Sequence, residues 1–291
     1  MPVGQLLVSG IATGAIYALV ALGFSLIYRS TRTINFAQGE ILMAAGYLGY
    51  WAHTSLGLPL LLAYVFAVLA AMVLVAAVER VAFQPMYDHR AGPILVIVSS
   101  IGLVLVIQTA LQLLWGPQAI PVPSAIAGHV VVAGVSITAQ QILIVAVSAI
   151  LIVALELMLR TPFGVALRAA AENRDIAALL GVRGRRMATF SYALGGGLAA
   201  VGGVLITPTT LLTPTGGSTV GLLGLVAAIV GGLGDMRGAV VGGVVVGLIG
   251  AFAGYWFGGA YAEVVVFGVL VVTLVLRPWG LLGEEGMVSR V

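Results

Sequence analysis

Residues 93–115 read PILVIVSSIGLVLVIQTALQLLW, a run without a charged side chain. Because an α-helix rises 1.5 Å per residue, a helix over this stretch would extend roughly 34 Å. The hydrocarbon core of a bilayer is about 30 Å thick, and about 20 consecutive apolar residues cross it. The run is therefore predicted to cross a membrane as a single helix.

Eight further stretches, on both sides of this run, have the same apolar character. Together the nine predict an all-α, polytopic membrane helical bundle of about eight or nine transmembrane helices, forming one domain over residues 1–291. The second and the seventh of the nine are the weakest candidates. The other eight stretches span residues 5–28, 34–52, 58–79, 139–159, 187–206, 218–234, 238–257 and 261–276.

The composition excludes a soluble fold and several classes of enzyme. Hydrophobic residues make up 61% of the chain and charged residues 8%, whereas soluble domains carry about 25% charged residues. There are no cysteines, which excludes disulfides and cysteine-ligated metals. All 13 basic residues are arginine, so a phosphate-binding loop with its lysine is absent, and we expect no ATP hydrolysis by that route. The three histidines lie in separate loops, so no metal site is expected.

The arginines predict the orientation of the chain. All of them fall in five connecting segments, and the connections between these carry none. Arginine is enriched in cytoplasmic loops, so we expect the N-terminus outside and the C-terminus in the cytoplasm. This bias also accounts for the pI of about 9.4 without nucleic acid as a partner. The arginine-bearing segments are 29–33, 80–92, 160–186, 235–237 and 277–291.

The segment 116–138 lies between two arginine-bearing segments and carries no arginine itself. It contains three prolines and then a stretch, from Val130 to Thr138, in which apolar and polar residues alternate. Alternation of this kind is typical of short strands. We expect an external loop that includes a small hairpin.

Glycines recur every four positions in the last third of the chain. Small residues at this spacing form a smooth stripe on a helix, which lets another backbone approach closely. We expect tight helix packing there, rather than a direct role in a transport pathway. The glycines concerned are Gly234, Gly238, Gly242, Gly250 and Gly254.

The segment 160–186 reads RTPFGVALRAAAENRDIAALLGVRGRR and is long and polar. The Thr-Pro pair near its start is typical of a helix N-terminus, and Gly181 is placed to end the helix. Arg168 and Glu172 stand four residues apart and can pair on one helical face. A connector this long with its own helix is unusual. The features fit a docking element for another protein, or a solvated amphipathic connector.

The segment 35–40, Asn-Phe-Ala-Gln-Gly-Glu, places an acid inside an apolar stretch. Counted from Arg32, Glu40 would lie roughly 12 Å deep along a helix. An acid within a membrane is costly and usually faces the bundle interior or water. One interpretation pairs Glu40 with Arg29 or Arg32. The other is a cytoplasmic gate or pathway wall formed by Asn35, Gln38, Gly39 and Glu40.

Three motifs give the chain a family resemblance. Part of 160–186 has the form G-x-x-x-R-A-x-A-x-N, which resembles the coupling loop in permeases of branched-chain amino acid ABC uptake systems. The block 21–47, which contains the Asn-Phe-Ala-Gln-Gly-Glu run, and the block 231–243, GGLGDMRGAVVGG, are similar to two further motifs of that family. Their order and separation agree over nearly the whole chain. The matching loop residues are Gly164, Arg168, Ala169, Ala171 and Asn173.

The chain also departs from the general pattern of such loops, which centres on Glu-Ala-Ala followed by a glycine. Here the order is Ala170-Ala171-Glu172, and Gly181 comes nine residues after the glutamate. The resemblance nevertheless implies that this loop docks on an ATPase. The coupling residues that it implies are Gly164, Arg168, Ala169, Ala170, Ala171, Glu172, Asn173, Asp175 and Gly181.

The resemblance implies a permease subunit of an ABC importer for branched-chain amino acids, in a bacterial inner membrane. Such a subunit is not itself an enzyme and needs no cofactor, because ATP and Mg²⁺ bind to separate ATPase subunits. The other implied partners are a second, homologous permease, a periplasmic or extracellular substrate-binding protein and membrane lipid. Closure of the ATPase pair would switch the membrane halves between two states of alternating access.

Two other functions fit parts of the sequence. Related ABC permeases carry urea or short amides, and the substrate of the cognate binding protein would distinguish them. A stand-alone secondary transporter or channel would need ionisable groups at mid-membrane, where Glu40 alone comes near. It would also have no use for a helix in 160–186.

Overall fold

The computed structural model describes residues 2–88, 92–126, 128–132, 134–172 and 174–283. Within this part, nine helices have 16 or more residues, and each corresponds to one of the nine predicted stretches. The all-α membrane bundle is therefore confirmed. These helices are α1 (Pro2–Thr31), α2 (Gln38–Thr54), α3 (Leu60–Val78), α5 (Pro93–Trp115), α6 (Ala139–Arg160), α9 (Gly184–Thr210), α10 (Gly216–Gly231), α11 (Met236–Phe257) and α12 (Gly259–Leu276).

Seven of these helices are long and apolar enough to cross a membrane. The two others are α2, with 17 residues, and α10, with 16, and they correspond to the two weakest predicted stretches. Both lie in the bundle interior, where most of their residues are buried. Short helices here are enclosed by longer ones, so they need not match the bilayer thickness themselves.

Four shorter helices lie at the ends of the long ones. The π-helical segment η1 (Glu79–Phe83) and α4 (Gln84–Asp88) continue α3, so this helix extends beyond the predicted end at residue 79. A π-helical turn inside a helix often marks a functional position. The remaining two, α7 (Pro162–Glu172) and α8 (Arg174–Leu179), form the segment between α6 and α9.

Helix α1 lies at the centre of the bundle and packs against α11, α9, α10 and α6. Helix α9 in turn packs against α2 and α3. By contrast, α5 packs mainly on α2, and α12 packs on α11 and α10. Both of these peripheral helices expose many apolar side chains, as expected for surfaces that face lipid or another membrane subunit.

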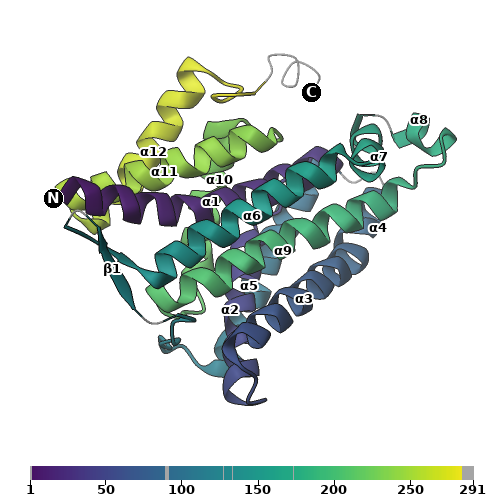
Figure 1. Ribbon diagram of the computed structural model, residues 1–291. Helices are drawn as coiled ribbons and strands as arrows, with labels where there is room; N and C mark the ends of the chain where they lie inside the picture. Colours follow the sequence, from purple (N-terminus) through teal and green to yellow (C-terminus); the bar gives the residue numbers. More distant parts are fainter. Residues whose placement is uncertain (1, 89–91, 127, 133, 173, 284–291) are drawn as a thin grey trace.

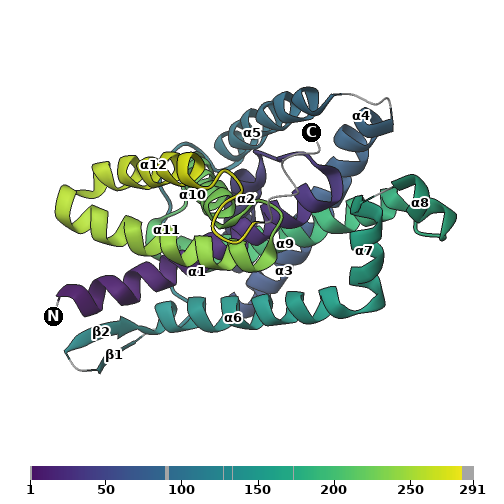
Figure 2. The ribbon, with the colours of Figure 1, turned by 90° about the horizontal axis from the view of Figure 1, so that it is seen from above.

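The N-terminus and the β-hairpin lie at one end of the bundle, and α4, α7 and α8 lie at the other (Figures 1 and 2). The expected hairpin is present as β1 (His129–Val132) and β2 (Val135–Thr138), paired antiparallel with His129 opposite Thr138. Gln5 of α1 donates to the carbonyl of Ser136 at 2.9 Å and accepts from its amide at 3.1 Å. The hairpin is thereby attached to the start of α1.

Glycine contacts explain the close packing of α11. A Cβ atom on Gly238 or Gly242 would collide with backbone atoms of α10, and one on Gly243 would lie 2.5 Å from the backbone of Ala18 in α1. Gly250 and Gly254 have only ordinary contacts with side chains of α12, the nearest atoms lying 3.8 and 3.7 Å from such a Cβ. Gly234 is not on a helix. It lies in the turn before α11 with a φ of +93°, a conformation that favours glycine.

Candidate membrane-embedded polar site and coupling segment

The chain between α1 and α2 does not continue as a helix. Arg32 has a φ of +56°, and residues 33–35 have no regular structure. Helix α2 begins at Gln38, so Glu40 lies in its first turn. The prediction counted helical residues from Arg32 to Glu40, and this count is wrong because the break intervenes. Asn35, Gln38 and Glu40 are nevertheless almost fully buried.

Glu40 joins three helices through hydrogen bonds. Its Oε1 atom accepts from Nε2 of Gln108 on α5 at 2.9 Å and from the hydroxyl of Ser218 on α10 at 2.6 Å. Gln108 also donates to the Ser218 hydroxyl at 2.9 Å. We call these three residues the Glu40 cluster. Within the described part of the chain, the hydrogen-bond partners of this carboxylate are thus an amide and a hydroxyl from other helices.

Gln38 and Gly39 hold the start of α2 close to two neighbouring helices. The side chain of Gln38 donates to the carbonyl of Gly195 on α9 at 2.6 Å. A Cβ atom on Gly39 would collide with the carbonyl oxygen of Gly217 and lie 2.8 Å from the Cα of Gly221, both on α10. The four predicted pathway residues therefore lie together at one buried junction of α2 with α9 and α10.

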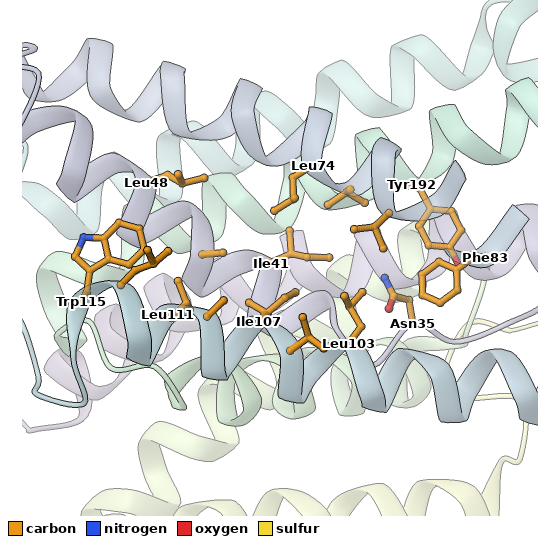
Figure 3. Close-up of a pocket in the computed structure, with 16 residues that line it drawn as sticks. Asn35, Ile41, Leu48, Leu74, Phe83, Leu103, Ile107, Leu111, Trp115 and Tyr192 are labelled. Atoms are coloured by element: carbon orange, nitrogen blue, oxygen red, sulfur yellow. The ribbon is translucent and has the colours of Figure 1, made fainter. Parts of the chain in front are cut away.

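A cavity of about 320 Å³ lies next to this junction, between α2, α3 and α5 (Figure 3). Its walls are largely aliphatic, and Trp115 lies at one end. Asn35, Phe83 and Tyr192 lie at the other end. The Asn35 Oδ1 atom accepts from the amide of Ala37 at 3.1 Å. Its Nδ2 atom is buried and has no hydrogen-bond partner among the described residues. We call this space the Asn35 cavity.

A chain of hydroxyl groups lies beside the same end of the cavity. The hydroxyls of Thr31 and Thr33 lie 2.9 Å apart, Thr33 and Tyr87 2.9 Å apart, and Tyr87 and Tyr192 3.0 Å apart. This chain joins the end of α1 to α4 and α9. The sequence did not indicate Tyr87, Tyr192, Gln108 or Ser218, since none of them belongs to a local motif.

Two further hollows, of about 330 and 350 Å³, lie around α1 and α10. They share several hydroxyl-bearing residues and are more polar than the Asn35 cavity. These residues were not predicted either, although hydroxyl groups spaced four residues apart on an apolar helix are a signal that could have revealed them. The shared residues are Ser9, Thr13, Tyr17 and Thr219.

The turn between α6 and α7 is held by several close contacts. A Cβ atom on Gly164 would collide with the backbone of Leu159, and Arg168 donates from Nη1 to the Leu159 carbonyl at 2.9 Å. The rings of Phe163 on α7 and Phe190 on α9 meet edge to face, with centroids 4.4 Å apart. These contacts fix α7 to the long helices on both sides of it.

One predicted detail of this segment differs in the structure. The Thr161 hydroxyl donates to the Met158 carbonyl at 2.6 Å, so it closes α6 and does not cap α7. Helices α7 and α8 lie on either side of residue 173, which is outside the described residues. Gly181 follows the second with a φ of +82°, and the amide of Val182 donates to the Ala177 carbonyl at 2.9 Å, a helix ending of the predicted kind.

The predicted coupling residues are only partly described. Gly164 and Ala170 are buried, Arg168 and Ala169 are half-buried, and Gly181 is exposed. Asn173, together with the side chains of Ala171, Glu172 and Asp175, lies outside the described residues. The exposed side chains beyond them include three arginines, Arg183, Arg185 and Arg186, and several large apolar residues. Ile176, Leu179 and Leu180 are 57%, 87% and 75% exposed.

Comparison with known proteins agrees with the fold. A family described as "Branched-chain amino acid transport system / permease component" matches residues 6–274. Among solved structures, PsaBC from Streptococcus pneumoniae in complex with Fab is similar, with a TM-score of 0.53 and 15% identity. That match covers 94% of this chain and 91% of the other, and at this identity it supports the fold alone.

Sequence relatives extend over almost the full chain. The high-affinity branched-chain amino acid transport system permease protein BraD of Pseudomonas aeruginosa is 34% identical and covers 96% of this chain and 95% of its own. LivH of Escherichia coli K12, which has the same description, is 31% identical with the same coverage. A probable branched-chain amino acid permease of Methanocaldococcus jannaschii is 27% identical over 92% of this chain and 88% of its own. The chain therefore belongs to the family of branched-chain amino acid transport system permease components.

Proposed function

We propose that this chain is the membrane-spanning subunit of an ABC importer that moves branched-chain, hydrophobic amino acids into the cytoplasm. The observation that carries the proposal is the near full-length similarity to permeases named for that substrate class. A subunit of this kind binds no ATP of its own. ATP and Mg²⁺ would bind to separate ATPase subunits, in agreement with the absence of lysine from the chain.

The geometry of α7 and α8 supports docking of an ATPase at this segment. The contacts of Gly164 and Arg168 at Leu159 make the α6–α7 turn stiff. A stiff connection would transmit a displacement of α7 into α6 and α9, whereas a flexible one would absorb it. The exposed apolar side chains of Ile176, Leu179 and Leu180 form a surface of the kind found at protein interfaces.

The proposed orientation places α4, α7 and α8 in the cytoplasm and the β-hairpin outside. In support, arginine-bearing segments that are distant in sequence meet at one end of the molecule. Arg160 and Arg237 lie 2.6 and 3.3 Å from the same carboxylate oxygen of Glu156. One-sided placement of arginine indicates the cytoplasmic face, so the N-terminus would be outside and the C-terminus inside, in a bacterial inner membrane.

We propose two further partners. A second, homologous permease would complete the transport pathway, and the exposed helices α5 and α12 offer apolar surface for such a contact. An external binding protein would deliver the amino acid at the end that carries the hairpin. In this scheme, movement of α7 would shift α9, which contacts both Gln38 and the Asn35 cavity, and would thereby switch access to the pathway.

Purification of the affinity-tagged chain from its native membrane, in mild detergent, tests the proposed assembly. Mass spectrometry of the bound proteins should identify an ABC ATPase and a second permease in near-equal amounts. The ATPase activity of the complex should rise with a binding protein loaded with leucine, and should not rise with urea or acetamide. A chain that purifies alone and still transports its solute would support the stand-alone transporter instead.

A further inference from the structure

We propose that the Asn35 cavity is a binding site for the free hydrophobic amino acid inside the membrane. The carboxylate of the ligand would accept a hydrogen bond from Asn35. Its ammonium group would lie against the rings of Phe83 and Tyr192, and its side chain would lie along Ile41 and Ile107. This inference rests on the proposed function, because it assigns the substrate class to one place in the fold.

The first observation is an unused donor. Asn35 is only 1% exposed, and its Oδ1 atom is already engaged by the amide of Ala37. Its Nδ2 atom has no hydrogen-bond partner in the part of the chain that the structure describes, although Asn35 lines the cavity. Figure 3 shows the side-chain nitrogen of Asn35 directed toward the aliphatic part of the cavity. A buried donor without a partner is unfavourable, and a ligand with an acceptor atom would relieve that cost.

The second observation concerns the aromatic rings beside this donor. Phe83 and Tyr192 both line the cavity, with ring centroids 5.5 Å apart. The hydroxyl of Tyr192 is already within hydrogen-bonding distance of Tyr87, which leaves the ring itself for a ligand. Aromatic faces attract ammonium groups, most strongly where water is excluded. The end of the cavity thus offers partners for both charges of a zwitterion.

The rest of the cavity matches an apolar side chain. From Asn35 the walls continue along Ile41, Leu103 and Ile107 to Trp115 at the far end (Figure 3). The volume of about 320 Å³ falls at the lower end of ligand sites, which are about 300–1,000 Å³. None of the described residues that line the cavity is charged. Beyond Asn35, Tyr192 and Trp115, a polar solute such as urea would meet only apolar side chains along these walls.

A lipid acyl chain is the competing occupant, because part of the cavity wall on α5 is exposed. A hydrocarbon chain has no acceptor for the Asn35 amide, so it would leave this donor without a partner. Only a ligand that joins an acceptor to a compact apolar group satisfies both ends. The two occupants can be distinguished with photoreactive probes of each chemistry.

The test uses the complete transporter, with its ATPases, second permease and binding protein, in lipid nanodiscs. A leucine analogue with a diazirine in its side chain is photolysed in the complex, and the labelled peptides are mapped by mass spectrometry. We expect labelling within 93–115 of α5 that excess leucine removes and excess urea does not. A phospholipid with a diazirine in its acyl chain serves as the second probe.

Two variants and one control sharpen the test. Asn35→Asp keeps the oxygen that accepts from Ala37 and removes the amide donor, so labelling by the leucine probe should fall about tenfold or more. Ile107→Trp fills the cavity and should reduce labelling to a similar extent. It keeps the test decisive if Asn35→Asp does not fold. Leu105→Trp also introduces a tryptophan on α5, at an exposed residue that does not line the cavity. The leucine probe should label this control as strongly as it labels the parent.

The outcomes separate this inference from the proposed function. If the parent complex transports leucine but is labelled elsewhere, or only by the lipid probe, the cavity is not the amino acid site although the proposed function stands. Undiminished labelling in both cavity variants also contradicts the inference. If the complete complex transports no leucine, the proposed function fails, and this inference fails with it.

Discussion

Gln108 on α5 and Glu40 on α2 are joined by a hydrogen bond of 2.9 Å. The same carboxylate oxygen accepts a second bond from Ser218 on α10. Because α5 packs mainly on α2, the Glu40 cluster is a polar connection between a peripheral helix and the bundle interior. A connection of this kind would hold α5 in place next to the Asn35 cavity while the rest of its surface meets lipid or a partner subunit.

Glu40→Gln should reduce transport while the subunits still assemble. The amide oxygen can still accept from Gln108 and Ser218, but hydrogen bonds to a charged group contribute about 1.5–3 kcal/mol, against about 0.5–1.5 kcal/mol for neutral pairs. Leucine uptake and recovery of the complex by size-exclusion chromatography are the two measurements. Normal uptake, or loss of the assembled complex, would each contradict the expectation. Leu105→Ala, which removes an exposed side chain from α5, is the control.

Gly39→Ala should destabilise the protein. The new Cβ atom would collide with the Gly217 carbonyl on α10, and overpacking of this kind costs typically about 1–3 kcal/mol. Thermal unfolding in detergent should show a lower midpoint. Gly102→Ala on α5 has no atom within 4 Å of the added methyl group and should unfold as the parent does. Equal midpoints for the two variants would mean that α2 and α10 do not cross as closely as described.

The double variant Leu179→Asp with Leu180→Asp should insert normally but lose the ATPase. Both side chains are highly exposed and apolar, and two carboxylates in an apolar interface are costly to desolvate. The amount of ATPase that copurifies with the tagged chain is the measurement, and we expect a decrease of about tenfold. Ser55→Asp, at an exposed position beyond α2, is a control that should retain the ATPase.

Exchange of the charges at Arg168 and Glu172 is a less direct test of docking. Arg168 donates to the Leu159 carbonyl, so a glutamate in its place would remove a contact that holds the α6–α7 turn. Loss of activity could then arise within this chain rather than at the partner. The exposed leucines avoid this difficulty because they contribute to no described hydrogen bond of the turn.

The orientation predicts which introduced cysteines react from outside the cell. The parent contains no cysteine, so in each single-cysteine variant only the introduced residue of this chain reacts with a thiol reagent. Ser124→Cys, in the loop before the hairpin, should react with a membrane-impermeant maleimide in intact cells. Ser289→Cys, near the C-terminus, should react only after the membrane is permeabilised. The opposite pattern would invert the orientation and place α7 on the wrong side for an ATPase.

The helices could be predicted from the sequence because each is an apolar run with its own length and boundaries. Even the two weak candidates, α2 and α10, proved to be short helices inside the bundle. The break before α2 could not be located, since it depends on the left-handed backbone conformation of Arg32. Composition does not reveal that conformation. The residues around Thr161 could not be assigned either, because its hydroxyl can serve the helix before it or the one after it.

Only one part of the polar site, the residues from Asn35 to Glu40, could be predicted from the sequence. The run from Asn35 to Glu40 is visible as polar residues in an apolar stretch, but Gln108 and Ser218 are single polar residues in otherwise apolar helices. Glu40 and Ser218 are 178 positions apart in the chain. Their contact depends on how α2, α5 and α10 pack against one another, and this packing cannot be derived from a single sequence.

Uptake of radiolabelled leucine into proteoliposomes tests the central claim most directly. The liposomes would contain this chain with its copurified permease and ATPase, with ATP and Mg²⁺ at the ATPase side and the binding protein at the opposite side. We predict leucine accumulation that requires ATP hydrolysis, that excess isoleucine or valine suppresses, and that excess urea leaves unchanged. Accumulation of urea or an amide in place of leucine, or leucine uptake that continues without ATP and the ATPase, would contradict the account.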